Sequence, residues 1–296
     1  MAPLPRWTWF SWLSDQPCER IAAGTARGRM NRRRVEAGNA RPAPRPFSAR
    51  PLMAPLTLSV DIGGSNIKAS VLDAKGRMIA PKLQVTTPPH PVPASLLRTI
   101  AMLARQLPPY DRVSAGFPGY VWRGRVCTAP NLGTDDWRNF PLAQALSRRL
   151  HRPARVLNDA DVQGLGVIDG DGLECVLTFG TGVGSALFKD GRLLPHLELG
   201  QHPIWKRKTY DQYLGDKAFK RKGREHWNLR VKRAIAFVLT LTNCDTLHLG
   251  GGNASAIDFE LPKNVRIASN AGGVTGGVKL WTKDLDEFFG SDPVKR

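Results

Sequence analysis

The sequence has no apolar run long enough to cross a membrane. A membrane-spanning helix needs about 18 or more consecutive apolar residues, and the longest apolar stretches here are only as long as a strand. The four cysteines, Cys18, Cys127, Cys175 and Cys244, lie far apart and form no CxxC pair. This argues against a disulfide framework and a structural zinc cluster, and it suits a reducing compartment. We therefore expect a cytoplasmic protein with no membrane segment.

Acidic residues are scarce, with 25 Asp and Glu against 43 Lys and Arg in 296 residues. The net charge is +18, and a hydrophobic content of 42% still allows a buried core. Residues 1–52 differ from the rest, because they hold ten Arg, no Lys, three acidic residues and seven Pro, without hydrophobic periodicity. We expect a disordered basic extension, or upstream sequence read before a true start at Met53. A tail that binds nucleic acid or a membrane surface and an organelle transit peptide are the alternatives.

From Met53 onward, strands alternate with helices. A buried strand enters a Gly-rich turn and returns as a second strand at residues 56–72 and again at 175–189. This repeated hairpin predicts two similar lobes that face each other across a cleft. The other expected elements are strands at 113–117, 154–157 and 246–249 and helices at 95–107, 142–150, 159–168 and 225–243. Such alternation indicates an α/β class with largely parallel sheets covered by helices.

Three Gly-rich segments follow predicted strands. They are DIGGSNIK at 61–68, TFGTGVGS at 178–185 and LGGGN at 249–253. Glycines at a tight turn let backbone N–H groups approach an anion closely, since no Cβ intervenes. Asp61 can hold Mg²⁺, directly or through water, and Lys68 can face a phosphate. The alternative for each segment alone is an ordinary hairpin or turn.

Several polar residues are candidates for chemistry on a substrate. Asp159, in LNDAD, follows a buried strand and opens a helix, where a general base can be positioned; a helix N-cap is the alternative. Glu198, in LELGQ, lies on a Gly-flanked loop and is otherwise a surface residue. Asn131 is otherwise a turn residue, and Trp137 is otherwise part of the core.

The order of these motifs resembles the ROK family of sugar kinases (repressor, open reading frame, kinase), within the actin-like ATPase superfamily. The blocks that carry the likeness are DIGGSNIK, FPGYVWRGRVCTAPNL, LNDAD, LTFGTGVGSA, LELG and LGGGN, between about residues 56 and 282. The polyphosphate glucokinases of the family are the most similar. The resemblance implies a two-lobed actin-like (ribonuclease H-like) fold with a central cleft. It places the smaller lobe at 53–157 and the larger at 158–296, whose last helix packs back on the first lobe.

The resemblance also implies a function. Asp159 is the expected general base for the sugar 6-hydroxyl, and Mg²⁺ is the expected cofactor. The residues expected to bind the sugar are Asn131, Asn158, Glu198, Gln201 and Asp211. Those expected to bind phosphates are Asp61, Gly63, Gly64, Ser65, Lys68, Thr178, Gly180, Thr181, Gly182, Gly250, Gly251 and Gly252. Alignment and charge neutralisation are what phosphoryl transfer chiefly needs.

Three departures from the family stand out. Gln201 occupies a position where many members have His. The family's zinc cluster CxCGxxGC is absent, so we expect no zinc. The second sugar-binding Glu has no obvious counterpart. Asp211 is the candidate for that role. Polyphosphate glucokinases lack the zinc cluster as well.

The donor and the acceptor remain open. Residues 205–233 contain eleven Lys or Arg against three acidic residues, a local net charge of +8. This cluster favours polyphosphate over ATP, because a long polyanion needs a track of cations. The alternative interpretation of the cluster is a solvated helix face. Glucose is the expected sugar and mannose the alternative. A non-catalytic ROK regulator is disfavoured because residues 1–52 show no helix-turn-helix pattern. We expect a homodimer that does not bind nucleic acid.

Overall fold

The computed structural model describes residues 54–269 and 272–289 of the chain, so the predictions for residues 1–52 lie outside the described residues. The first of its two large sheets has the strand order β3-β2-β1-β4-β7. β1 and β2 form an antiparallel hairpin, and β1, β4 and β7 run parallel. These strands are β1 (Thr57–Ile62), β2 (Asn66–Leu72), β3 (Leu83–Thr86), β4 (Arg112–Phe117) and β7 (Ala154–Asn158).

The second sheet repeats this topology, with the order β10-β9-β8-β13-β14. Here β8 and β9 form the hairpin, and β8, β13 and β14 run parallel. Its strands are β8 (Leu173–Phe179), β9 (Val183–Lys189), β10 (Arg192–Leu193), β13 (Thr246–Gly250) and β14 (Val265–Ile267). The prediction of two similar halves, each built on a Gly-rich hairpin, is confirmed. Two small hairpins complete the strands, β5 (Val121–Trp122) with β6 (Arg125–Val126) and β11 (Pro203–Trp205) with β12 (Lys208–Thr209).

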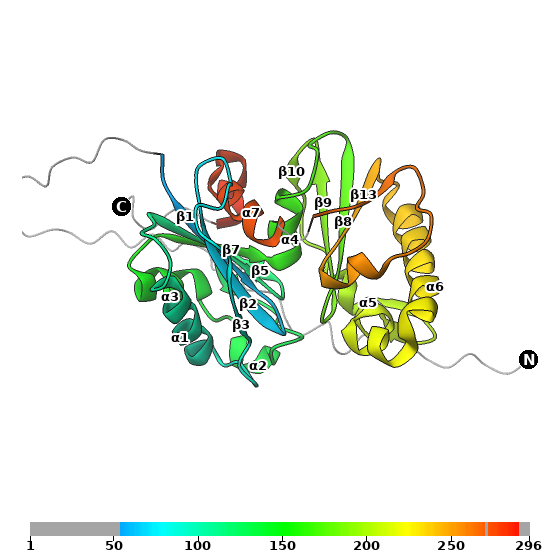
Figure 1. Cartoon of the computed structure of the whole chain (residues 1–296), viewed down its shortest axis with the longest axis horizontal. Coiled ribbons are helices and arrows are strands. Elements are labelled where there is room, and N and C mark those ends of the chain that lie inside the picture. The colour runs from blue at the N-terminus through cyan, green and yellow to red at the C-terminus, as the bar shows by residue number, and fades with distance from the viewer. Residues whose placement is uncertain (1–53, 270–271, 290–296) are drawn as a thin grey trace, which may run out of the picture. The chain divides into compact units, whose positions relative to one another are not determined.

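Helices cover both sheets (Figure 1). α1 and α3 share one hydrophobic core with the first sheet, and α6 shares another with the second sheet. The helices are α1 (Pro93–Ala104), α2 (Thr134–Trp137), α3 (Leu142–Leu150), α4 (Asp159–Leu165), α5 (Tyr210–Leu214), α6 (Asp216–Thr242), α7 (Gly272–Thr275) and α8 (Asp286–Phe289). Short 3-10 segments are η2 (Leu199–Gln201), η3 (Gly252–Ala256), η4 (Gly276–Trp281) and η5 (Lys283–Leu285). Trp137 belongs to the first core and is fully buried, as its alternative interpretation held.

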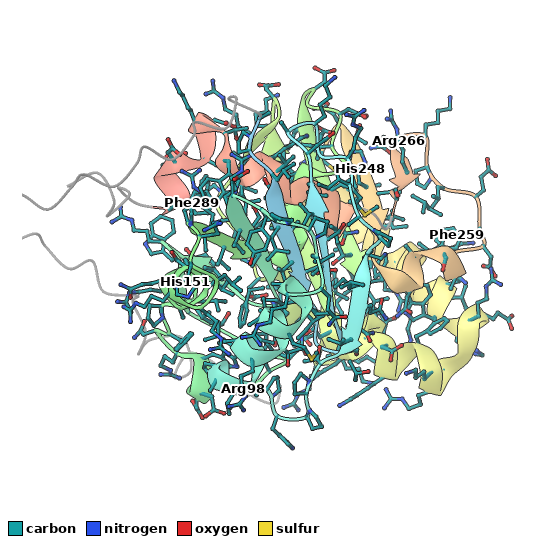
Figure 2. The ribbon with its side chains drawn as sticks, turned by 60° about the vertical axis from the view of Figure 1, so that its left-hand side comes forward. Arg98, His151, His248, Phe259, Arg266 and Phe289 are labelled. Atoms are coloured by element: carbon teal, nitrogen blue, oxygen red, sulfur yellow. The ribbon has the colours of Figure 1, made fainter. Side chains whose placement is uncertain are left out.

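α4 lies between the two sheets and connects them. It contacts β4 and β7 on one side and β8 and β9 on the other, and its Val162 and Leu165 pack with Val176 and Phe188 of the second sheet. α7 and η4 lie against α4 and also contact β1. The C-terminal part of the described chain therefore packs on the first sheet. Phe289, at the end of α8, supports this arrangement because the Arg155 guanidinium lies over its ring, 4.6 Å from the centroid (Figure 2).

Three predicted helices end or begin elsewhere, and the one expected at 95–107 is α1, Pro93–Ala104. The helix after Asp159 stops at Leu165 instead of Ile168, and Gly166 is its C-cap. The backbone of Gly272 lies too close to Gly166 to admit a Cβ atom there. The helix predicted at 225–243 begins at Asp216, and Gly223 interrupts it with a φ of 74°. The first part, before Gly223, carries mostly exposed cations and no apolar period, so the hydrophobic pattern alone could not reveal it.

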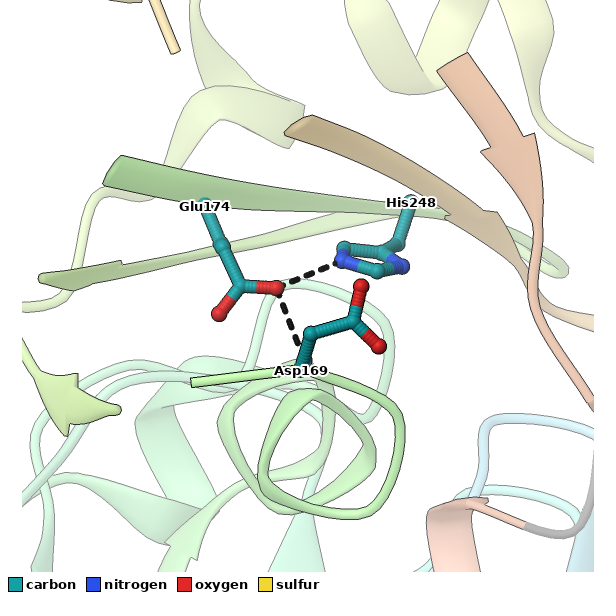
Figure 3. Close-up of side chains that lie close together, drawn as sticks. All are labelled: Asp169, Glu174 and His248. Atoms are coloured by element: carbon teal, nitrogen blue, oxygen red, sulfur yellow. Dashed lines mark hydrogen bonds and ion pairs between the residues drawn. The ribbon is translucent and has the colours of Figure 1, made fainter. Parts of the chain in front are cut away.

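A buried carboxylate ties the loop after α4 to the second sheet (Figure 3). Oε1 of Glu174 accepts hydrogen bonds from the backbone N–H of Asp169 (2.8 Å) and pairs with Nε2 of His248 (2.9 Å). Oε2 accepts from the N–H of Gly170 (2.7 Å). Asp169 is in turn paired with Arg266, at 2.6 Å. Each oxygen of the buried acid thus has a partner, as burial of a carboxylate requires. No helix of the described residues is long and apolar enough to span a membrane.

Candidate functional site

Residues from both sheets line one polar cleft of about 420 Å³, a volume within the range of small-molecule sites. The cleft collects every residue predicted for the site except Gly250. Those that line it are Asp61, Gly63, Gly64, Ser65, Lys68, Asn131, Asn158, Asp159, Thr178, Gly180, Thr181, Gly182, Glu198, Gln201, Asp211, Gly251 and Gly252. Gly250 is instead packed inside the second sheet, where a Cβ atom would collide with the side chain of Gln163.

The two Gly-rich hairpin turns meet at one end of the cleft. The hydroxyl groups of Ser65 and Thr181 are 2.9 Å apart and share a hydrogen bond, which joins the turn after β1 to the turn after β8. A Cβ atom on Gly182 would come within 2.7 Å of the Asp211 carboxylate. Only glycine therefore allows the second turn to pass this close to α5. Lys68 projects from β2 into the cleft and forms an ion pair with Asp61 of β1, at 3.1 Å.

The third Gly-rich segment approaches the same end. Gly251 has a φ of 84°, a conformation that side chains with a Cβ rarely adopt. A Cβ there would also overlap the backbone of Phe179 at the end of β8. β13 therefore lies directly beside the second hairpin, and Gly251 and Gly252 both line the cleft.

Asp159 opens α4 in the floor of the cleft, but Asn158 caps the helix. Oδ1 of Asn158 accepts hydrogen bonds from the N–H groups of Ala160 (2.8 Å) and Asp161 (3.3 Å). Its Nδ2 donates to the carbonyl of Gly119, at 3.2 Å. The N-cap alternative for Asp159 is therefore wrong, because its neighbour performs that task. The amide of Asn158 is also largely occupied by the backbone.

The environment of Asp159 opposes ionisation. Burial, and next the nearby negative charge of Asp61, raise its pKa to about 8, although its hydrogen bond from Ala160 favours the ionised form. Glu198 raises the pKa further and His196 lowers it. A carboxyl group that titrates near neutral pH inside a cleft is typical of groups that exchange protons with a substrate.

Glu198, Gln201 and Asp211 form a second polar group in the cleft, and Asp211 lies against the second hairpin turn. Asp211 is the second residue of α5, whose first turn is held by a capping box between Thr209 and Gln212. Its carboxylate accepts hydrogen bonds from the N–H of Val183 (2.6 Å) and from Nε2 of Gln201 (2.8 Å). Burial, in the first place, raises the pKa of Asp211 to about 6.

Sequence reasoning did not assign five further polar residues to the cleft, or assigned them only to a charged surface. They are Asn66, Gln163, Asp216, Lys220 and Asn253. Lys220 and Asp216 lie one turn apart at the start of α6 and form an ion pair of 2.6 Å. Asp216 also donates its N–H to the carbonyl of Gly180 at 2.9 Å, which fixes this end of α6 on the second hairpin. The only signal in the sequence was the basic run itself.

Comparison with known proteins agrees with this architecture. The family model described as "ROK family" matches residues 57–197. A polyphosphate glucokinase from Mycobacterium leprae is 28% identical over 246 residues, which cover 76% of this chain and 74% of that protein. The crystal structure of an inorganic polyphosphate/ATP-glucomannokinase from Arthrobacter sp. strain KM has a TM-score of 0.71 and 29% identity, and covers 76% of this chain and 97% of that one.

A second solved structure supports the fold alone. It is a ROK family glucokinase from Streptomyces griseus in complex with glucose and AMPPNP, with a TM-score of 0.64 and 21% identity over 76% of this chain and 98% of that one. The repeated sheet topology and the cleft between the sheets are therefore those of the two-lobed actin-like fold that sequence analysis predicted. Residues 57–197 of this chain thus resemble the ROK family in sequence as well as in fold.

Proposed function

We propose that this protein is a sugar kinase that transfers a phosphoryl group from inorganic polyphosphate or ATP to the 6-hydroxyl of glucose. The observation that carries the proposal is that Asp159 lines one cleft together with two Gly-rich hairpin turns and a group of hydrogen-bonding side chains. The likeness to polyphosphate glucokinase and to a polyphosphate/ATP-glucomannokinase supports the same reaction.

Asp159 acts as the general base in this proposal. Its ionised carboxylate takes the proton of the sugar hydroxyl as that oxygen attacks the terminal phosphorus of the donor. A pKa of about 8 suits this task, because a base works best when its pKa is near the working pH. With Asn158 as the cap of α4, the Asp159 carboxylate is not needed to hold the helix.

The hairpin turns receive the phosphates. Their backbone N–H groups supply donors without charge, and Lys68 supplies a positive charge. The residues fit a magnesium ion, because Mg²⁺ is commonly held by one or two carboxylates together with the phosphates of the substrate. Asp61 of β1 is the carboxylate that would hold it, and the ion supplies neutralisation of the phosphate charge. Lys68 forms an ion pair with Asp61 at 3.1 Å, so a positive side chain already lies beside this carboxylate.

Glu198, Asn131, Gln201 and Asp211 orient the sugar in the proposal. Glu198 has a side chain that is 32% exposed toward the cleft, and a carboxylate there can accept two sugar hydroxyls. Gln201 keeps an amide oxygen for hydroxyl donors while its Nε2 is bound to Asp211. Asn158 contributes to this group mainly by fixing the segment around Gly119.

The basic surface beside the cleft supports polyphosphate as the donor. Part of the +8 cluster has structural partners: Arg224 pairs with Asp258, Arg233 lies over Trp205, and Arg230 lies over the Tyr213 ring. The cations before the interruption at Gly223 are exposed, and one of them, Lys220, reaches the cleft. The exposed cations of this first part of α6, which we call the basic ramp, are Lys217, Lys220, Arg221 and Lys222.

Charge reversal tests the basic ramp. Replacing Lys220, Arg221 and Lys222 with Glu is expected to raise the KM for long polyphosphate more than the KM for ATP, since ATP ends before the outer cations. The difference should shrink as salt rises, because screening acts over about 8 Å at physiological ionic strength. Turnover at saturating donor should persist. Equal losses for both donors would contradict the ramp, and an unchanged KM for every donor would favour ATP.

A matched control carries the same change of charge elsewhere. Arg98 of α1 (labelled in Figure 2), Arg105 directly after α1 and Arg149 of α3 are exposed, and none of them lines the cleft. Their replacement with Glu should leave the KM for polyphosphate unchanged. A similar rise in both triple variants would mean that net charge, and not the ramp, attracts the polyanion.

The proposed reaction itself is tested by a matrix of acceptors and donors. The purified protein is assayed with glucose and mannose against ATP, GTP and long polyphosphate, and phosphorylated sugar is measured directly. We expect glucose 6-phosphate with polyphosphate or ATP. Mannose belongs in the matrix because the Arthrobacter protein is a glucomannokinase. Absence of any sugar phosphate with every donor would overturn the proposal.

A further inference from the structure

A second buried carboxylate–imidazole pair lies just behind Glu198 and has no part in the reaction described so far. Nδ1 of His196 is 3.2 Å from Oδ1 of Asp161, which lies on α4, two residues after Asp159. The two side chains are 6% and 4% exposed. Neither residue lines the cleft within the described part of the chain. They are therefore positioned to act on the site only through a neighbour.

That neighbour is Glu198. Nε2 of His196 points toward Oε2 of Glu198 at 3.8 Å, an ion-pair distance, and this buried nitrogen has no hydrogen-bond partner among the described residues. Oε2 also accepts a hydrogen bond from the Thr128 hydroxyl, at 3.2 Å. Both contacts involve the same oxygen, so they leave Oε1 of Glu198 for a ligand in the cleft.

The imidazole is held in place from a third side. The ring of Tyr120 stacks on it, with centroids 5.6 Å apart and planes inclined by 10°. The backbone N–H of Tyr120 donates to the Thr128 hydroxyl at 2.9 Å, and that hydroxyl donates to Glu198. Residues from the first sheet's side of the cleft thus clamp both His196 and the carboxylate that it faces.

We propose that Asp161 and His196 form a positioning pair that holds the Glu198 carboxylate in place and directs its free oxygen toward the sugar. The inference rests on the proposed sugar-kinase function, and it adds a specific role for two residues outside the cleft. A cation next to one oxygen and a hydroxyl donor on the same oxygen fix the orientation of the carboxylate. Charge-assisted contacts of this kind are stronger than neutral ones and set direction as well as energy.

The charges around His196 support its protonated form. Burial lowers its pKa, but the carboxylates of Asp161 and Glu198, which face it from α4 and from its own loop, outweigh burial and raise it to about 10. The other titratable group against the ring is Tyr120, and beyond Glu198 stand Asp159 and Asp211. The protonated His196 ring is thus surrounded mainly by carboxyl groups.

The test compares His196→Gln and Asp161→Asn with His248→Gln. His248 is the matched control, because it is also a buried histidine paired with a carboxylate, at 2.9 Å, but it does not line or support the cleft. The pair predicts that both site variants raise the KM for the sugar by about tenfold or more, with a smaller change in kcat, as weakening of a charge-assisted contact implies. His248→Gln should lower the melting temperature and leave the KM for the sugar unchanged.

A second readout does not depend on activity. The Cε1–H resonance of His196, assigned by its loss in His196→Gln, should report a protonated ring at about pH 8, where an ordinary histidine is neutral. In Asp161→Asn it should titrate at lower pH. A His196 that titrates near its ordinary value, or a sugar KM equal to that of the wild type in both site variants, would overturn the positioning pair. If the wild-type protein phosphorylated no sugar, the proposed function would fail, whereas the resonance would still test the geometry.

Discussion

The titration of Asp159 gives a prediction that follows directly from its surroundings. Burial and the Asp61 charge raise its pKa to about 8, so the base form is scarce below that pH. The ratio kcat/KM for the donor at saturating glucose reports the pKa values of groups in the enzyme–glucose complex. The donor is not yet bound in that form, so the charge of its phosphates does not shift them. We expect this ratio to rise about tenfold per pH unit below about pH 7 and to level off above about pH 8. Its value at about pH 9 should then exceed that at about pH 6 by about ninetyfold.

Asp61→Asn tests the cause of the shift. The substitution removes the largest charge contribution and keeps the shape of the side chain, so the pKa of Asp159 falls and the acid limb of the profile moves to lower pH. Absolute rates will also fall if Asp61 holds the metal, but the position of the limb is read separately from its height.

Initial rates across about pH 5 to 10 with a direct assay of glucose 6-phosphate provide the measurement. The reasoning would be refuted by a profile that breaks near the ordinary carboxyl pKa of about 4. It would be refuted equally by an Asp61→Asn limb that stays where the wild-type limb lies.

Two further predictions concern the frame of the site. Gly251→Ala should cost about 1–3 kcal/mol of stability and raise the KM for the donor, because it forces a side chain into a φ of 84° against the backbone of Phe179. Denaturant unfolding measures the stability, and donor titration measures the KM. No change in either quantity would contradict the close approach of β13. Glu174→Ala should lower the free energy of unfolding by about 3–5 kcal/mol, because it leaves buried His248 without its partner. The value of kcat per folded molecule should stay constant, and a lower kcat would link this network to catalysis.

The sequence predicted the fold well wherever glycine and hydrophobic pattern act locally. The hairpins at β1–β2 and β8–β9 have largely buried strands and turns that need glycine. The bounds of α3 equal those predicted. β3 was not predicted, because its alternating exposure gives a weak signal over only four residues. The start of α6 escaped for a related reason, since its exposed cations have no apolar period.

The site was predictable in membership but not in detail. Strand ends and glycine turns indicate which residues reach a cleft, and all but Gly250 line it. No sequence pattern shows that Asn158, and not Asp159, caps α4, because both types are good caps. The contact of His196 with Asp161 joins positions 35 residues apart, and only the crossing of α4 with the loop before η2 brings them together.

The removal of the Asp159 carboxylate tests the central claim most directly. Asp159→Asn keeps the shape of the side chain, so glucose binding measured by calorimetry and the melting temperature should stay close to the wild-type values. Glucose phosphorylation should fall by about 10²–10⁴, the usual loss for a general base. A variant that binds glucose normally and retains more than half of the wild-type turnover would contradict the assignment of Asp159 as the base.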